Sequence, residues 1–426
     1  IWWDDLPEVV EVKQNDIEEA KKKFQQAKEK YEAMTDVYEQ KKLAEDNGKW
    51  MRSLISTGTF NDRIKALALI VQAGPFNTYG YLMQLLNHCQ KKNKDEAELA
   101  IRATKELFQT YLMPPRVLYS FQQRDFTVAT PFILTKYYFE HLIKNAYAQF
   151  IEILRKATMD QLEKFKVTII KCASELVVTV PEQRSNMLSV VVNKMGDING
   201  KTASKASYFV SEMLRKHEEV ATDIIGAIRD VISRPNISAT AVRRCLTALN
   251  SIKYSRKNPQ QAEAMLSLLV VYFTSLFKEK NQDVRALQNV IIGMRKCTQY
   301  CKNFDEARKH LNELYKLART APLTRSIECI SMLSEIDSTK RFMRLLYERI
   351  DDIHSMTSAK QLFYISLIRK TLLSDTSYEV IASFIKRLLI NALTEEPPFI
   401  CGVLSIISEL LAKHKLLRTL FSSGSA

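Results

Sequence analysis

From about residue 50 onward, apolar side chains recur every three or four positions, in stretches separated by short polar breaks. Residues 64–71, 169–177 and 266–277 are typical, and each stretch is apolar over a broad part of a helical circumference. This period predicts α-helices, and no stretch alternates convincingly in the manner of a strand. Helices with such broad apolar faces must pack against two neighbours. We therefore expect an all-α protein with about fifteen helices after residue 48.

The expected helix boundaries follow from capping residues. Gly58 can close one helix, and Thr59 with Asp62 forms a capping box that opens the next. Thr130 precedes a proline at the first helical position, and Ser238 caps another helix. Successive helix pairs recur at roughly 35–45 residues, the spacing of HEAT and armadillo repeats. Because no strict repeat sequence accompanies this spacing, we expect an irregular α-solenoid of HEAT/armadillo-like helical repeats, a long curved body whose grooves can hold extended partners.

The first segment of the chain differs from the rest. Residues 15–47 are predicted to form one long polar helix with a narrow apolar stripe. The stripe is too thin for a core helix, so this helix should lie on the outside of the body or against another chain. Ahead of it, Trp2 and Trp3 are hard to keep in water and should be buried either against this body or against a partner.

Composition supports a helical fold. Only 10 glycines and 11 prolines occur in 426 residues, whereas average usage would give roughly 30 and 20. The chain therefore has too few turn-forming residues for a many-stranded sandwich, barrel or propeller. We divide the chain into an N-terminal segment, 1–48, and a helical-repeat domain, 49–426, with possible sub-blocks 49–200 and 201–426. Since the first residue is isoleucine rather than methionine, we expect a piece of something longer.

The distribution of charge along the chain indicates a class of function. Segment 1–48 has a net charge of −5, from 8 lysines and 13 acidic residues, and the remaining 54 basic and 35 acidic residues give 49–426 a net charge of +19. A body this basic attracts polyanions such as nucleic acid or an acidic protein, although the same charge also serves solubility alone. Contacts to backbone phosphate would not read sequence and would weaken steeply with salt. The candidate nucleic-acid contacts are Lys91, Lys92, Lys94, Arg243, Arg244, Arg256, Lys257, Arg295 and Lys296.

No catalytic or metal-binding signature is visible in the sequence. The chain has no GxGxxG or GxxxxGK(S/T) phosphate loop, and its six histidines are far apart. Cys297 and Cys301, with His310 further along, are the most suggestive group, but zinc needs four ligands at tight spacing and the others are missing. Two small buried residues on one helical face explain the pair better. We therefore expect no enzyme activity, no metal and no cofactor, and reduced cysteines in the cytosol or nucleus.

Several stretches resemble, in the same order, motifs of the CCAAT-binding factor/Mak domain family. They are residues 52–67, 205–217, 232–238, 341–361 and 384–409, and residues 2–4 resemble the Trp-Tyr-Asp sequence that precedes the family's domain. The likeness covers nearly the whole chain. One departure lies near residues 294–298, where only Arg295 remains of the family's Asn-Arg-Ala-Phe-Pro element.

The resemblance implies a helical-repeat assembly factor of the nucleolus that acts on the large (60S) ribosomal subunit. Members of the family bind early precursors of that subunit as heterodimers with a second nucleolar-complex protein. We therefore expect a non-enzymatic nuclear scaffold that binds pre-rRNA and takes part in its processing. Its expected partners are that protein and other pre-ribosomal assembly factors, with no membrane and no small-molecule substrate. Candidate partner-binding residues are Trp2, Trp3, Arg234, Pro235, Asn236 and Phe399.

Two other functions remain open. The animal member of the family has been assigned a transcriptional role at CCAAT promoters, so a DNA-associated transcription regulator is the alternative hypothesis. No helix-turn-helix, zinc finger or basic zipper is present to read bases. A transport adaptor would share the solenoid fold, but adaptors of the nuclear-import kind tend to be acidic, whereas this chain has a net charge of +14.

Overall fold

A computed structural model describes most of the chain, namely residues 2–4, 6–7, 17–42, 44–127, 129–256, 259–278, 283–356 and 358–418. These residues form twenty α-helices, joined by short 3₁₀ turns and one π-helical turn, and they contain no strand. The predicted all-α solenoid is confirmed. The chain divides into two compact units, residues 1–252 and residues 253–426, which we call unit 1 and unit 2. The sub-block boundary predicted at residue 200 lies inside unit 1 and stays a prediction.

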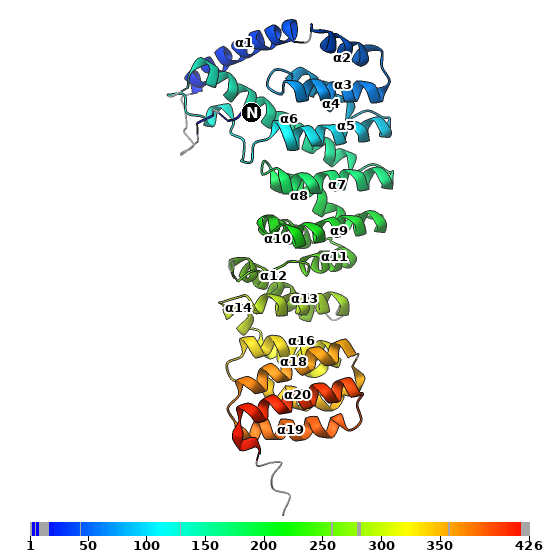
Figure 1. Cartoon of the computed structure of the whole chain (residues 1–426), viewed down its shortest axis with the longest axis vertical. Coiled ribbons are helices and arrows are strands. Elements are labelled where there is room, and N and C mark those ends of the chain that lie inside the picture. Colours follow the sequence, from blue (N-terminus) through cyan, green and yellow to red (C-terminus); the bar gives the residue numbers. More distant parts are fainter. Residues whose placement is uncertain are drawn as a thin grey trace, which may run out of the picture. The chain divides into compact units, whose positions relative to one another are not determined.

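Unit 1 is built from two layers of stacked helices (Figure 1). One layer contains α3, α5, α7, α9 and α11, each packed on the next, and the other contains α4, α6, α8 and α10. The helices are α1 (Ile17–Lys41), α2 (Asp46–Thr57), α3 (Phe60–Ala73), α4 (Tyr79–His88), α5 (Lys94–Leu107), α6 (Pro131–Ala157), α7 (Glu163–Thr179), α8 (Arg184–Val192), α9 (Gly200–Lys216), α10 (Ala221–Ile232) and α11 (Ala239–Leu249). Broad apolar faces make this stacking necessary, since each helix has neighbours on two sides.

Unit 2 is also built from stacked helices, several of which are shorter. Its helices are α12 (Pro259–Lys278), α13 (Val284–Thr298), α14 (Asp305–Arg308), α15 (Leu311–Thr320), α16 (Leu323–Ile336), α17 (Phe342–Glu348), α18 (Ser358–Ser374), α19 (Tyr378–Ala392) and α20 (Pro397–Lys413). Helix α16 lies centrally, in contact with α13, α15, α17 and α18, and α20 packs on α18 and α19. Eighteen helices of the described chain begin after residue 48, more than the predicted fifteen, because elements as short as α14 and α17 show too few turns for a periodic pattern.

The predicted caps are present. Thr59 and Asp62 form the expected capping box at the start of α3, and the Gly58 N–H closes α2 by donating to the Leu54 carbonyl. The Thr130 hydroxyl accepts a hydrogen bond from the Ile133 N–H ahead of Pro131, and Ser238 does the same at α11. Each cap satisfies a backbone group that the helix itself leaves unpaired, which is why these positions are readable from sequence.

The long N-terminal helix is shorter than predicted. Helix α1 ends at Lys41, and α2 begins at Asp46 after Glu45 takes up an extended backbone conformation. The interruption lets α2 pack on α3, whereas α1 packs on α6. The stripe of α1 is ordinary packing within the chain, since Ala20, Ala27 and Tyr31 are buried.

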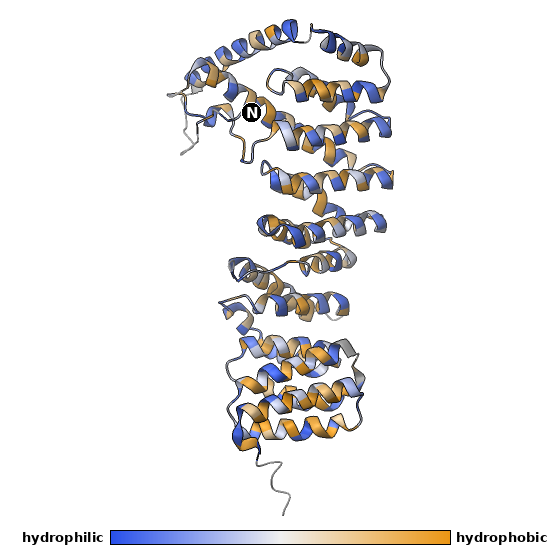
Figure 2. Ribbon diagram, in the orientation of Figure 1, coloured by the Kyte–Doolittle hydropathy of each residue, from blue (hydrophilic) through white to orange (hydrophobic). Residues whose placement is uncertain are grey.

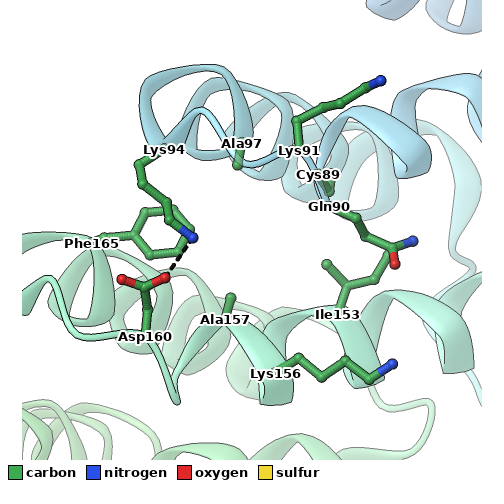
Figure 3. Close-up of a pocket in the computed structure, with 10 residues that line it drawn as sticks. All are labelled: Cys89, Gln90, Lys91, Lys94, Ala97, Ile153, Lys156, Ala157, Asp160 and Phe165. Carbon is green, nitrogen blue, oxygen red and sulfur yellow. Dashed lines mark ion pairs between the residues drawn. The ribbon is translucent and has the colours of Figure 1, made fainter.

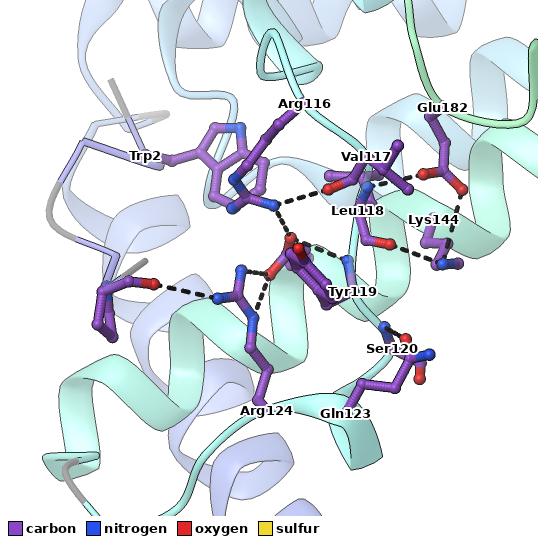
Figure 4. Close-up of polar contacts among 12 residues, drawn as sticks. Trp2, Arg116, Val117, Leu118, Tyr119, Ser120, Gln123, Arg124, Lys144 and Glu182 are labelled. Atoms are coloured by element: carbon purple, nitrogen blue, oxygen red, sulfur yellow. Dashed lines mark hydrogen bonds and ion pairs between the residues drawn. The ribbon is translucent and has the colours of Figure 1, made fainter. Parts of the chain in front are cut away.

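A buried polar cluster holds the N-terminal residues against the rest of unit 1 (Figure 4). The Trp2 indole N–H donates to the Leu112 carbonyl at 3.2 Å. The Trp2 and Phe139 rings pack edge to face, with 5.1 Å between their centroids. The Arg124 guanidinium donates to the Pro7 carbonyl at 3.4 Å and to the Glu140 carboxylate, which is completely buried. Trp2 is therefore buried against its own chain rather than against a partner.

Glu140 and a second buried carboxylate organise the long connection between α5 and α6. Glu140 also accepts from the Arg116 guanidinium at 2.6 Å and from the Tyr119 N–H at 3.2 Å. Glu182 accepts from the Leu118 N–H at 2.7 Å (Figure 4). Backbone groups of a connection that crosses a protein interior need such partners, because an unpaired buried group costs about 1–3 kcal/mol.

Hydrophobic residues concentrate between the layers of each unit (Figure 2). Within unit 2, α20 buries Phe399, Val403, Ile406, Ile407 and Leu410. Among the described residues, no helix combines the length and the hydrophobicity that crossing a bilayer requires.

Candidate nucleic-acid interface

The first layer of unit 1 contains a basic groove. It lies between the N-terminal halves of α7 and α9, with a volume of about 1240 Å³, and we call it the α7–α9 groove. Its lining residues are Glu163, Lys164, Val167, Thr168, Asn199, Gly200, Lys201, Ser204, Lys205, Tyr208 and Arg244. Four of these are cations and one is a carboxylate, so the lining has a net charge of +3.

Few of these charges are neutralised within the chain. Across the residues that the structure describes, no ion pair involves Lys164, Lys201 or Lys205. Arg244 is half-buried and donates from Nη1 to the Met195 carbonyl at 3.5 Å, and no carboxylate of a described residue pairs with it. The single acid, Glu163, accepts from the Asn199 amide at 3.1 Å. The groove therefore presents a positive potential that an anion could neutralise.

The sequence of α9 explains why these side chains share one face. Asn199 caps the helix, accepting from the backbone N–H groups of the following turn. Lys201, Lys205 and Tyr208 then recur at spacings of four and three residues, which places them on one exposed stripe. Thr202, Ala203 and Ala206 occupy the opposite, buried face.

Tyr208 gives the groove an aromatic surface. Its side chain is 51% exposed, and the Lys205 Nζ lies 6.0 Å from the ring centroid, at the outer limit of a cation–π contact. The ring also lines a second groove of about 730 Å³ between the C-terminal halves of the same helices. That second groove is largely neutralised, because Lys216 pairs with Glu212 at 2.6 Å and Lys171 with Glu175 at 4.0 Å.

The predicted cluster at the α4–α5 connection lines a smaller pocket of about 210 Å³ (Figure 3). Lys94 turns toward Asp160, with 2.5 Å between the charged atoms, and its Nζ lies 5.3 Å from the Phe165 ring. This contact lowers the pKa of the Asp160 carboxyl below its ordinary value. Lys91 is exposed at the rim, as is Lys156, a residue that the sequence did not single out.

The other predicted cations have varied surroundings. Arg243 is half-buried on α11 and donates to the Ala239 carbonyl, whereas Arg256 is exposed in unit 2. Arg295 pairs with the buried carboxylate of Glu328. Burial, followed by the neighbouring charge of Arg295, lowers the pKa of Lys296. Lys257 lies outside the described residues.

Of the eight predicted cations that the structure describes, only Arg244 lines the groove. Lys164, Lys201, Lys205 and Tyr208 were not among the predicted contacts, although the spacing of the last three was a readable signal. Unit 2 has a smaller basic pocket, of about 320 Å³, to which Lys316, Arg319 and Arg341 contribute. There Arg341 lies 3.6 Å from the Asp337 carboxylate, so part of its charge is already compensated.

Two of the candidate partner-binding residues need correction. Phe399 is 2% exposed within the core of unit 2, and Trp2 is 7% exposed, so neither ring has the free surface that a partner would contact. Trp3 is half-buried beside Trp2. Arg234, Pro235 and Asn236 are exposed together in the connection between α10 and α11.

Only one member of the cysteine pair is a core residue. Cys301 is half-buried and lies beyond the end of α13 at Thr298, so the prediction of two buried residues on one helical face is wrong for Cys301. Cys297 is buried in the last turn of α13, and its thiol donates to the Tyr254 hydroxyl at 3.1 Å. Burial raises the pKa of Cys297 to about 12 and that of Cys301 to about 12. Both are therefore protonated thiols near neutral pH and poor nucleophiles, because the thiolate is the reactive form. Within the described ranges, no three His, Cys, Asp or Glu side chains come together as a metal site.

Comparison with known proteins identifies relatives along most of the chain. The human CCAAT/enhancer-binding protein zeta is 29% identical over 388 residues, which cover 87% of this chain and 37% of the relative. The ribosome biogenesis protein NOC1 of Chaetomium thermophilum is 26% identical over 446 residues, covering 90% of this chain and 43% of the relative. Nucleolar complex protein 1 of Drosophila melanogaster is 25% identical over 398 residues, covering 87% of this chain and 33% of the relative. The chain thus spans 33–43% of the length of these relatives.

A solved structure and a family model complete the comparison. The crystal structure of Kap121p bound to Pho4p aligns with a TM-score of 0.52 and 13% identity, covering 84% of this chain and 37% of that one, which shows a shared helical-solenoid fold and nothing more. Residues 326–425 match the model of the CBF/Mak21 family. The resemblance to this family that the sequence predicted is confirmed by this match and by the relatives named above.

Proposed function

We propose that this chain is a non-enzymatic helical scaffold for assembly of the large ribosomal subunit in the nucleolus. The observation that carries the proposal is its alignment, over 87–90% of its length, with proteins named for ribosome biogenesis and for the nucleolar complex. Because the chain spans only part of those proteins, the proposed role is that of a binding body within a larger assembly factor.

Binding of pre-rRNA is the physical core of this proposal. The lining of the α7–α9 groove has a net charge of +3, and no described residue forms an ion pair with its three lysines, which supports contacts with backbone phosphate. Such contacts hold RNA without making or breaking a bond. They also release counterions, so affinity should fall steeply as salt rises.

The proposed protein partner is a second nucleolar-complex protein, bound as a heterodimer. Of the partner-binding candidates, the exposed connection of Arg234, Pro235 and Asn236 offers the most accessible surface. We propose that this connection contributes to the heterodimer contact. Its replacement by three glycines should weaken co-purification of the partner and leave RNA binding unchanged.

Crosslinking in cells, followed by sequencing of the attached RNA, tests the proposed function directly. We expect enrichment of precursor sequences of the large-subunit rRNA, and depletion of the protein should lower the amount of 60S subunit relative to 40S. Crosslinks spread evenly over messenger RNA, with unchanged subunit ratios, would contradict the proposal.

Regulation of transcription from CCAAT promoters is the second candidate, supported by the name of the human relative. A base-specific reader should prefer its site over unrelated duplex DNA by at least about a thousandfold. Competition between a CCAAT duplex and a scrambled duplex separates the two functions, since a phosphate-binding scaffold should not distinguish the two sequences.

A further inference from the structure

We propose that the α7–α9 groove binds an unpaired segment of RNA, with its phosphates at Lys164, Lys201, Lys205 and Arg244 and one base stacked on Tyr208. This inference rests on the proposed RNA-binding function and specifies the form of RNA that this groove accepts. Three features of the molecule support it: the charges of the groove, the exposed ring of Tyr208, and the neutral region beyond the ring.

The charges require a polyanion. Lys201 and Lys205 are one helical turn apart on α9, and Lys164 faces the same groove from α7. All three side chains are exposed, and among the described residues no carboxylate neutralises them. A chain of phosphates supplies several negative charges along such a groove, whereas a single anion would satisfy only one end of it.

The ring at Tyr208 selects among polyanions. About half of the side chain is exposed, and it lies beside the lysines rather than in a purely apolar patch. An unpaired base can cover such a ring face by stacking, because every base has a π-face. In a duplex the base faces are already stacked on one another, and an acidic peptide has carboxylates but no aromatic face.

The region beyond the ring limits where phosphates bind. Past Tyr208, the second groove contains Glu175 and Glu212, each paired with a lysine, so its local charge is nearly balanced. Phosphates should therefore lie on the side of Lys201 and Lys205, and the base on Tyr208 should mark the boundary of the charged footprint. This arrangement predicts that a short unpaired strand is sufficient.

Fluorescence anisotropy with the full chain tests the inference. Three labelled probes are compared: a 12-nucleotide oligouridine RNA, a 12-base-pair RNA duplex and a 12-residue polyglutamate peptide. The variants are Tyr208→Ala, Tyr208→Phe, and the double variant Lys201→Ala/Lys205→Ala. The matched control is Lys22→Ala/Lys30→Ala, which removes two exposed lysines from α1.

We expect the oligouridine to bind more tightly than the duplex or the peptide. Tyr208→Ala should weaken its binding roughly 5- to 150-fold, the range for loss of one stacked base, and Tyr208→Phe should retain wild-type affinity because the ring remains. The double lysine variant should reduce the slope of log affinity against log salt by about 1.4, since each phosphate contact to a single strand contributes about 0.7. The control variant and all thermal melts should be nearly unchanged.

Other outcomes overturn the inference and are distinguishable from failure of the proposed function. If the lysine variant weakens binding but Tyr208→Ala does not, or if the duplex binds as tightly as oligouridine, the groove contacts phosphate alone and the inference is wrong, while RNA binding stands. Tighter binding of polyglutamate than of either RNA would make the groove a protein-docking site. Absence of binding to every RNA would overturn both this inference and the RNA-binding part of the proposed function.

Discussion

The α7–α9 groove of unit 1 and the charged cluster around Glu328 in unit 2 combine the same kinds of residue with opposite results. In the groove, Lys205 lies beside Tyr208, and no carboxylate in the described structure neutralises the lysine. In the cluster, Arg295 lies 4.9 Å from the Phe363 ring, but the nearly buried Glu328 pairs with Arg295 and, at 2.7 Å, with Lys360. In this cluster the carboxylate of Glu328 neutralises the cations, as a bound phosphate would.

This difference shows that net charge is a poor guide to an anion-binding surface. Unit 2 has 26 basic and 17 acidic residues, a net charge of +9, whereas unit 1 has 36 basic and 31 acidic residues, a net charge of only +5. The larger basic groove nevertheless lies in unit 1. Whether a cation is available depends on which carboxylates the fold brings beside it.

The largest expected effect comes from a carboxylate that neutralises buried cations in unit 1. Glu140→Gln removes the buried negative charge that pairs with the Arg124 guanidinium, which is 1% exposed, so we expect a loss of about 3–5 kcal/mol in the free energy of unfolding. Urea unfolding followed by tryptophan fluorescence measures it, because all three tryptophans lie in unit 1. Glu152→Gln, which removes an exposed partner of Arg155, is the control and should change stability by less than about 1 kcal/mol. Equal effects of the two variants would contradict the argument.

A smaller loss is expected from the cluster in unit 2. Glu328→Gln leaves Arg295 and Lys360 uncompensated, but both reach solvent, so the expected loss is about 2–3 kcal/mol, below the usual range for a fully buried pair. Far-UV circular dichroism during thermal unfolding measures it. Glu335→Gln, whose partner Lys370 is well exposed, serves as the control. A melting temperature unchanged by Glu328→Gln would show that the comparison with the groove is mistaken.

Charge reversal at the α4–α5 connection should affect binding rather than stability. Lys91→Glu/Lys92→Glu changes two exposed lysines, so RNA affinity should fall about two- to fivefold at moderate salt with an unchanged thermal melt. Lys94→Gln should do the reverse, leaving RNA affinity unchanged and costing up to about 1 kcal/mol of stability, because Lys94 is paired with Asp160. Anisotropy and thermal unfolding of the two variants decide between these assignments.

The smallest expected effect is a dependence of stability on pH. The hydrogen bond from Lys94 lowers the pKa of the Asp160 carboxyl below its ordinary value of 3.8. The ion pair therefore stabilises the folded chain above about pH 4, and this contribution is lost as pH falls through the folded-state pKa. Asp160→Asn retains an acceptor for the Leu162 N–H, so its melting temperature should be below that of the wild type at pH 6, and the difference should shrink as the pH falls below 4. A constant difference across this range would refute the assignment.

Much of the fold could be predicted from the sequence, because helices depend on local signals. The capping box at Thr59 and the cap at Ser238 each depend on residues within three positions, and both predictions were correct. The break before Asp46 was missed, because the polar residues around it continue the helical pattern and only the packing of α2 on α3 requires the chain to turn. Local periodicity carries no information about such tertiary contacts.

The candidate site was less predictable for the same reason. Lys94 and Arg295 looked equivalent to other basic residues, since Asp160 and Glu328, which neutralise them, are 66 and 33 positions away. Conversely, Lys164 joins the groove only because α7 packs on α9. Ion pairing between distant segments, rather than the composition of a cluster, determined which cations were available.

The Tyr38 hydroxyl on α1 packs closely against Gly74, and its ionisation can be followed by absorbance. A methyl group at position 74 would lie 2.2 Å from the Tyr38 hydroxyl oxygen, so Gly74→Ala must rotate the phenol outward. Burial now raises the pKa of Tyr38 above its ordinary value of 10.0. Exposure of the ring would return the pKa of Tyr38 toward 10.0, and the ultraviolet absorbance of phenolate, followed against pH, would record this exposure.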